Sequence, residues 1–203
     1  MKIIGITGGI GAGKSQVLSY LKEEYGAVVC QADQVAKRLQ KKGTRCHRRI
    51  TEHFGPGILD ETGRLERAKL ANIVFSNQAQ LRVLNEIVHP AVKEKIRETI
   101  RREEKKGTAV FVLEAALFIE EKYDALCDEV WYIYADEETR KKRLMASRGY
   151  SEEKIKGIFA SQMSSSDFFT YCDRAVDNCN SFQETCGEID GIMAQLHIGK
   201  TRN

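Results

Sequence analysis

Short apolar runs alternate along the chain with longer segments whose apolar residues recur at helical spacing. The runs predict five buried strands, at residues 2–7, 27–30, 110–113, 130–135 and 175–176. Between the first two runs, Val17, Leu18 and Leu21 have the spacing of one helix face over residues 15–24. Strands separated by helices predict an α/β fold with a parallel sheet flanked by helices.

The region between the second and third strands has an almost wholly helical pattern. It predicts helices at residues 34–42, 67–75, 78–88 and 91–106. Pro90 is expected to separate the last two, because the residue before a proline is pushed away from helical geometry. So much helix is too long for a simple crossover between strands, so we predict a helical insert over residues 34–107.

Two further helices are predicted after the fourth strand by their starting residues. Asp136 precedes Glu137 and Glu138, and Ser151 precedes Glu152 and Glu153. Asp and Ser cap helix N-termini well, and acidic residues are favourable in a first turn.

The strongest chemical signal is the segment Gly8-Gly9-Ile10-Gly11-Ala12-Gly13-Lys14-Ser15, which matches the Walker A pattern G-x-x-x-x-G-K-[ST]. It follows a predicted strand and opens a predicted helix, as the motif requires. Its glycines allow successive N–H groups to converge on phosphate oxygens at a helix N-terminus. Lys14 is expected to reach the β- and γ-phosphates, and the Ser15 hydroxyl to bind Mg²⁺. The structural alternative is a glycine-rich turn that binds nothing.

Two carboxylates follow predicted strands, at the edge where ligands bind in open α/β sheets. Asp33 can accept a hydroxyl proton, hold Mg²⁺ through water, or merely cap the next helix. Glu114 stands where a Walker B carboxylate occurs, although Asp is the more usual residue there. For both residues the local sequence leaves the structural and functional interpretations open.

Basic residues gather in two places. Arg140 and Arg143 lie about 60° apart around one predicted helix, so both can address one anion, or both can belong to a solvated face. Residues 37–49 hold seven Lys and Arg and no acid. This run fits a route for a phosphorylated substrate, a nucleic-acid patch or an exposed helix face.

The composition is typical of a globular protein and identifies no ligand. The chain has 203 residues, 42% hydrophobic and 30% charged, and its net charge of +3 is too small to indicate nucleic-acid or membrane binding. No apolar stretch approaches the ~20 residues of a spanning helix. The six cysteines form no C-x-x-C pair, which favours free thiols over a zinc site. Free thiols are typical of the reducing cytosol, so we expect a cytoplasmic protein.

Taken together, these segments resemble dephospho-CoA kinases over nearly the whole chain. The start, from Thr7 to Ser15, is similar to the family's T-G-G-I-G-S-G-K-S, and Ala32-Asp33 resembles the end of its D-A-D segment, with Gln31 in place of the first Asp. Further similarities lie at His53-Phe54-Gly55, Gly63-x-Leu65-x-Arg67, Leu84-Asn85 with His89-Pro90, Arg143-Leu144, Gln162 and Asp177-Asn178.

The resemblance implies a P-loop kinase that transfers the ATP γ-phosphate to the ribose 3′-hydroxyl of dephospho-CoA, the last step of coenzyme A synthesis. It implies a five-stranded parallel core (residues 1–33, 108–139 and 173–203), a CoA-binding insert (34–107) and a mobile lid (140–172). Asp33, Lys14 and Arg143 become the catalytic candidates. Mg²⁺ is the implied cofactor, held by Ser15 and through water by Asp33. Acceptor binding falls to Arg67, His89 and Glu114, and ATP binding to Gly8, Gly9, Gly11, Ala12, Gly13, Lys14, Ser15, Gln16, Arg140 and Asn178.

Two other classes remain open from the residues alone. One is a kinase for a different small acceptor, such as a nucleoside, a nucleotide or shikimate. The other is a nucleotide-dependent switch or ATPase without an acceptor.

Overall fold

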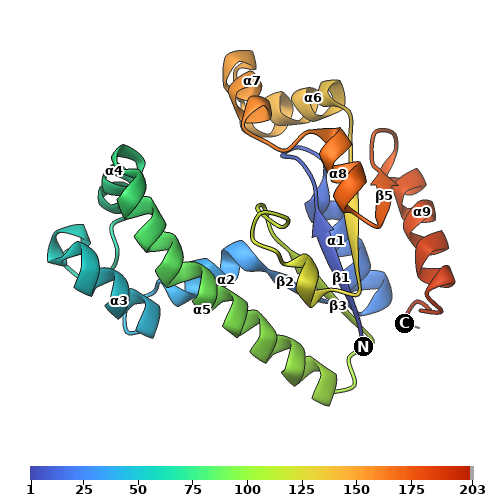
Figure 1. Ribbon diagram of the computed structural model, residues 1–203. Coiled ribbons are helices and arrows are strands. Elements are labelled where there is room, and N and C mark those ends of the chain that lie inside the picture. Colours follow the sequence, from blue (N-terminus) through green and yellow to red (C-terminus); the bar gives the residue numbers. More distant parts are fainter. Residues whose placement is uncertain (202–203) are drawn as a thin grey trace. The chain divides into compact units, whose positions relative to one another are not determined.

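The computed structural model describes residues 1–201 and contains one five-stranded sheet. Its strands are β1 (Lys2–Thr7), β2 (Val28–Gln31), β3 (Val110–Glu114), β4 (Glu129–Tyr134) and β5 (Arg174–Asp177), in the spatial order β2-β3-β1-β4-β5. β1 pairs in parallel with β3 and β4, and β4 pairs in parallel with β5. Figure 1 shows the strands and the helices that accompany them. The predicted α/β class and parallel sheet are confirmed.

By contact, the chain divides into two compact units. One contains Met1–Val29 and the chain from Glu103 onward, and the other contains Cys30–Arg102. The first holds α1 (Lys14–Tyr25), α6 (Glu137–Arg148), α7 (Glu152–Ala160), α8 (Ser165–Tyr171) and α9 (Phe182–Gln195). The second holds α2 (Ala32–Leu39), α3 (Arg45–Phe54), α4 (Arg67–Ser76) and nearly all of α5 (Gln78–Lys105). This second unit overlaps the insert predicted at residues 34–107.

The core of the first unit forms where apolar side chains of the sheet meet α1 and α9. It includes Ile4, Ile6, Val112, Trp131, Ile133 and Val176 from the strands, with Val17, Leu21, Ile189 and Met193 from the helices. All of these side chains are buried. Burial of this apolar surface fixes the sheet beneath the glycine segment.

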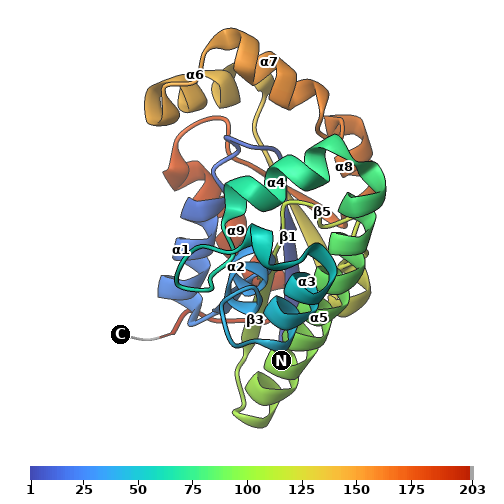
Figure 2. The same ribbon diagram turned by 90° about the vertical axis from the view of Figure 1, so that its left-hand side faces the viewer.

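The helices α1 and α9 lie next to each other in the first unit (Figures 1 and 2), and polar side chains join them. The hydroxyls of Tyr20 and Tyr25 both donate to Asp190, at 2.7 and 2.6 Å, and Lys200 forms an ion pair with the same carboxylate at 2.9 Å. The backbone N–H of Thr201 donates to Glu24 O at 2.8 Å. The last described residues therefore close over the C-terminal turn of α1, whose other end opens at the glycine segment.

The predicted break at Pro90 is wrong. A single helix, α5, runs from Gln78 to Lys105 with Pro90 inside it. Proline removes one helical hydrogen bond and costs about 3 kcal/mol in a helix interior. Ile87, Val88, Val92 and Ile96 lie on both sides of Pro90 and are buried. Their packing holds the two halves of the helix together despite this cost.

The helix caps confirm two predictions and exclude one of the interpretations left open for Asp33. Asp136 and Ser151 cap α6 and α7, and their side chains accept hydrogen bonds from Thr139 N and Lys154 N. Asp33, in contrast, is not a cap. The helix α2 begins at Ala32 after Gln31, so Asp33 lies within its first turn and does not precede the helix. The cap interpretation of Asp33 is therefore removed.

No helix among residues 1–201 combines the length and the hydropathy that crossing a membrane requires.

Candidate functional site

The glycine segment links the carboxyl end of β1 to the N-terminus of α1, where helix N–H groups favour an anion. Two of its glycines are required by close approach. A Cβ on Gly8 would lie 2.5 Å from the backbone oxygen of Ile133, and a Cβ on Gly13 would lie 2.1 Å from Asn178 Nδ2. Gly13 also has a φ of 88°, which a side chain would strain. The Walker A prediction is thus matched by the loop's backbone.

Lys14 folds back over this loop. Its Nζ donates to Gly8 O at 2.7 Å and to Gly9 O at 3.3 Å. The side chain therefore keeps its positive charge at the loop. A cation in that position suits the β- and γ-phosphates of a nucleotide.

Arg140 and Arg143 lie on the same helix, α6, in different surroundings. Arg140 is only 6% exposed. Its Nε donates to Ile10 O at 2.9 Å, its Nη2 donates to Gln162, and its guanidinium lies 4.1 Å from the centre of the Phe159 ring. Burial lowers the pKa of Arg140 from its ordinary value. Arg140 thus directs its Nε and Nη2 groups toward other residues of the protein.

Arg143 keeps a donor unused. Its Nη1 is buried and has no hydrogen-bond partner among the described residues. The same atom lies 3.5 Å from the point where a Cβ on Gly13 would be. A buried, unsatisfied donor is costly and calls for an explanation. Thr7 Oγ1, directly before the loop, is likewise buried without a hydrogen-bond partner among the described residues. The sequence did not single out Thr7 beyond its place in the family motif.

Asn178 supports the loop from the end of β5. It is 1% exposed, and its Nδ2 donates to Ala12 O at 2.7 Å. Its Oδ1 accepts from the hydroxyl of Thr185 at 3.0 Å. Both ends of the amide are therefore engaged within the protein. The sequence analysis missed Thr185, on α9, because no local motif marks a side chain whose role is to hold another side chain, here Asn178, in place.

The remaining predicted residues are divided between the two units. Glu114 is 8% exposed at the carboxyl end of β3, opposite Ile6 in the sheet register. In the other unit, Asp33 is exposed near the start of α2, Arg67 is the exposed first residue of α4, and His89 is half-buried on α5. The structure thus assigns Glu114 to the unit of the glycine loop, and the other three to the helical unit.

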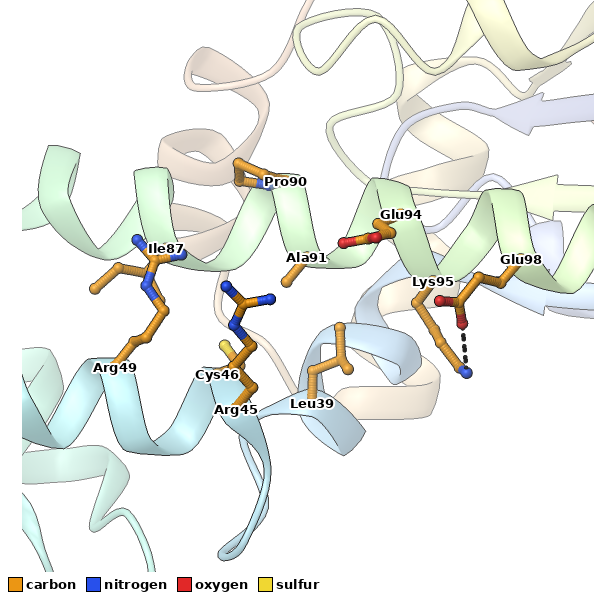
Figure 3. Close-up of a pocket in the computed structure, with 10 residues that line it drawn as sticks. All are labelled: Leu39, Arg45, Cys46, Arg49, Ile87, Pro90, Ala91, Glu94, Lys95 and Glu98. Carbon is orange, nitrogen blue, oxygen red and sulfur yellow. Dashed lines mark hydrogen bonds and ion pairs between the residues drawn. The ribbon is translucent and has the colours of Figure 1, made fainter.

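A pocket of about 380 Å³ lies within the helical unit, between α5 and the α2–α3 segment (Figure 3). Its walls combine apolar and charged side chains: Leu39, Arg45, Cys46, Arg49, Ile87, Pro90, Ala91, Glu94, Lys95 and Glu98. Glu98 forms an ion pair with Lys95 at 2.8 Å. At 100° per residue, Glu98 and His89 point to opposite sides of α5. The pocket therefore uses another helix face than His89, and the substrate route predicted for the basic run stays a prediction.

The cysteines show no sign of reactive or metal-binding chemistry. All six are free thiols, as predicted. Burial raises the pKa of Cys30 to about 11 and the pKa of Cys127, Cys172 and Cys179 to about 12. These thiols are protonated at neutral pH, whereas the thiolate is the nucleophile and metal ligand. Within residues 1–201, no group of three or more His, Cys, Asp or Glu side chains is arranged to hold a metal ion.

Comparison with known proteins gives a consistent family. Residues 2–184 match the family model described as dephospho-CoA kinase. The dephospho-CoA kinase of Carboxydothermus hydrogenoformans is 38% identical over 193 residues, which cover 95% of this chain and 93% of that protein. The dephospho-CoA kinase of Symbiobacterium thermophilum is also 38% identical, over 94% of this chain and 79% of its own length.

Solved structures agree with this result. The crystal structure of TT1252 from Thermus thermophilus has a TM-score of 0.80 and 29% identity, and the match covers 96% of this chain and 97% of that one. A dephospho-CoA kinase from Campylobacter jejuni has a TM-score of 0.72 and 25% identity over 97% and 98% of the two chains. A shikimate kinase from Acinetobacter baumannii, at 15% identity and a TM-score of 0.52, shares the fold alone.

Proposed function

The chain belongs to the dephospho-CoA kinase family, and we propose that it phosphorylates the ribose 3′-hydroxyl of dephospho-CoA with ATP bound at its glycine loop. Membership of this family makes the protein an ATP-dependent kinase that completes coenzyme A synthesis. The observation that best supports the proposed chemistry is that Lys14 and a buried, unsatisfied donor of Arg143 both lie at the glycine loop. Two cations at one phosphate loop suit transfer of a charged group.

Transfer of the phosphoryl group begins with attack by the acceptor. The 3′-hydroxyl oxygen forms a bond to the γ-phosphorus as the bond from γ-phosphorus to the β-phosphate oxygen breaks, which releases ADP. The hydroxyl proton passes to the Asp33 carboxylate, which acts as general base. Asp33 is exposed and therefore accessible to a substrate hydroxyl. Gln31, in place of the family's first Asp, carries no charge and cannot share this role.

The developing negative charge is stabilised by the loop and by Arg143. The loop N–H groups and Lys14 hold the β- and γ-phosphates, and Arg143 donates its unused N–H to a transferring oxygen. The segment that contributes to nucleotide binding comprises Gly8, Gly9, Gly11, Ala12, Gly13, Lys14, Ser15 and Gln16. Residues 140–172, which carry Arg143, form the proposed lid.

Magnesium fits the donors that the chain offers. The Ser15 hydroxyl and the Asp33 carboxylate are exposed oxygen donors, which this hard cation prefers. Mg²⁺ usually keeps several waters and takes other ligands from substrate phosphates, so few protein ligands are needed. When bound, the metal supplies neutralisation of the phosphate charge.

Acceptor binding is assigned to Arg67, His89 and Glu114. Arg67 stands exposed at the N-terminus of α4, where its guanidinium can pair with a phosphate of the acceptor. The substrates ATP and dephospho-CoA are small molecules, and the free thiols are typical of a reducing, cytoplasmic setting.

A substrate panel tests the proposal directly. With Mg-ATP, we expect the protein to phosphorylate dephospho-CoA by a wide margin over AMP, uridine and shikimate, as measured by ADP release and by mass analysis of the product. Removal of divalent cations with EDTA should abolish the transfer, and added Mg²⁺ should restore it. Preference for another acceptor would contradict the proposed substrate while leaving the kinase activity intact.

Charge reversal at Arg67 tests the acceptor site. Arg67→Glu should raise the KM for dephospho-CoA by about tenfold or more, because a charge-assisted hydrogen bond is lost and a like charge is added. The KM for ATP should change less than about twofold. Lys69→Glu is the matched control, since Lys69 lies on the same helix and forms an ion pair with half-buried Glu66 at 2.6 Å. Equal effects of Arg67→Glu on both KM values would contradict the assignment.

A further inference from the structure

Both main-chain polar groups of Ile10, in the glycine loop, are hydrogen-bonded to residues of the region 140–172. Arg140 Nε donates to Ile10 O at 2.9 Å, and Ile10 N donates to Gln162 Oε1 at 3.3 Å. Arg140 Nη2 donates to the same oxygen of Gln162. The main chain of Ile10 and the side chains of Arg140 and Gln162 therefore form a closed ring of hydrogen bonds at one residue of the phosphate loop.

The surroundings of this ring restrict its movement. Arg140 is buried and packs on Phe159, in the last turn of α7, just before Gln162. A Cβ on Gly9 would lie 2.4 Å from Arg140 Cζ, so the loop approaches the guanidinium as closely as glycine allows. A guanidinium stacked on a ring with two donors engaged has little freedom to reach a ligand.

We propose that Arg140 and Gln162 are positioning residues that hold the phosphate loop in its nucleotide-binding shape, and that Arg140 does not bind ATP by direct charge contact. The inference rests on the proposed function only in that a nucleotide binds this loop. Arg143, one turn further on, keeps a buried donor for the phosphates. The two arginines of α6 thus have different tasks: one organises the loop and the other meets the ligand.

The physical reason lies in preorganisation. Converging backbone N–H groups bind phosphate well only when the loop is already in place, because ordering it on binding would cost conformational entropy. Fixing Ile10 on both its N–H and its C=O removes that cost before the nucleotide arrives. The same bonds anchor the chain just after α7 to the loop, so nucleotide binding and the placement of this segment become linked.

The test compares single and double variants by calorimetric titration with ADP, which needs no acceptor. Gln162→Met keeps the side-chain length but removes the acceptor oxygen. Arg140→Lys keeps the charge but cannot donate to Ile10 O and Gln162 Oε1 at the same time in the geometry of a guanidinium. Each should weaken ADP binding by about tenfold, because the loop is no longer held in its binding shape before the nucleotide arrives. The double variant should be within about threefold of either single variant, since residues of one network are not additive. Gln162→Glu, which keeps the acceptor, should bind ADP within about threefold of wild type.

Two further measurements distinguish a positioning role from a general loss of folded structure. The KM for dephospho-CoA should stay within about twofold of wild type, and the melting temperature without nucleotide should fall by no more than about 4 °C. Gln78→Met, at an exposed residue of α5, serves as the control for loss of a glutamine amide. Should the wild type fail to phosphorylate dephospho-CoA, the ADP titrations would still decide this proposal.

Two results would overturn the proposal. One is wild-type ADP affinity in Gln162→Met together with a large loss in Arg140→Lys, which would mean that Arg140 contacts the nucleotide by itself. The other is a parallel loss of ADP affinity, acceptor KM and thermal stability in Gln162→Met, which would mean that the network only maintains the fold.

Discussion

Replacing Lys14 with alanine is expected to lower turnover by about 10²–10³-fold or more, because a cation aimed at the charge that develops in the transition state is removed. Nζ of Lys14 lies 2.7 Å from Gly8 O, at the loop itself. Steady-state kinetics with dephospho-CoA and Mg-ATP measures the effect. ADP affinity should also fall, since the β-phosphate loses the same partner.

Stability separates loss of chemistry from loss of structure in this variant. Lys14 also donates to two loop carbonyls, so its removal should cost about 1 kcal/mol, or a few degrees in melting temperature. Lys22→Ala, at an exposed residue near the other end of α1, is the matched control and should leave turnover unchanged. Wild-type turnover in Lys14→Ala would contradict the assignment of the glycine loop as the phosphate site.

Features that depend on neighbours in the sequence were predicted well. β1 was placed at residues 2–7 and is found from Lys2 to Thr7, because an apolar, β-branched run ends abruptly at glycine. The caps Asp136 and Ser151 were also found, since capping depends on residues only three positions apart. The loop itself was predictable for the same reason: its chemistry is written in eight consecutive residues.

Features that depend on distant residues were not predictable. Gln162 bonds to Ile10, 152 positions away, and Asn178 bonds to Ala12, 166 positions away. No local sequence pattern shows that the amide groups of Gln162 and Asn178 are hydrogen-bonded to the loop backbone. In the structure, Arg140 and Asn178, two residues predicted to bind ATP, donate hydrogen bonds to backbone oxygens of the loop.

Pro90 shows a local rule overruled by packing. A proline lowers helix stability wherever it occurs, yet the buried residues that flank it continue the same apolar face. At the boundary between β2 and α2, the local sequence left several interpretations open and the backbone decides one of them. β2 passes into α2 with no residue between Gln31 and Ala32, so Asp33 cannot precede the helix. The backbone structure was therefore needed to show that Asp33 is not a helix cap.

Asp33→Asn is the second change with a large expected effect. If Asp33 is the general base, turnover should fall by roughly 10²–10⁴-fold, because the amide cannot accept the ribose proton. A carboxylate in the first turn of α2 also interacts favourably with the helix N-terminus, by about 0.3–1 kcal/mol. The melting temperature should therefore fall by only about 1–4 °C. ADP affinity should stay near that of wild type.

A magnesium titration of the same variant distinguishes the two ionised roles. A base variant keeps the Mg²⁺ concentration for half-maximal activity, whereas loss of a metal-holding carboxylate raises it along with the fall in turnover. Glu52→Gln, which removes an exposed carboxylate from α3 in the same unit, is the control and should be silent in both measurements. Near-normal turnover in Asp33→Asn would remove Asp33 from the catalytic residues. Glu114, at the end of β3, would then be the next carboxylate to test, because it lies in the register of the sheet opposite Ile6, two residues before the loop.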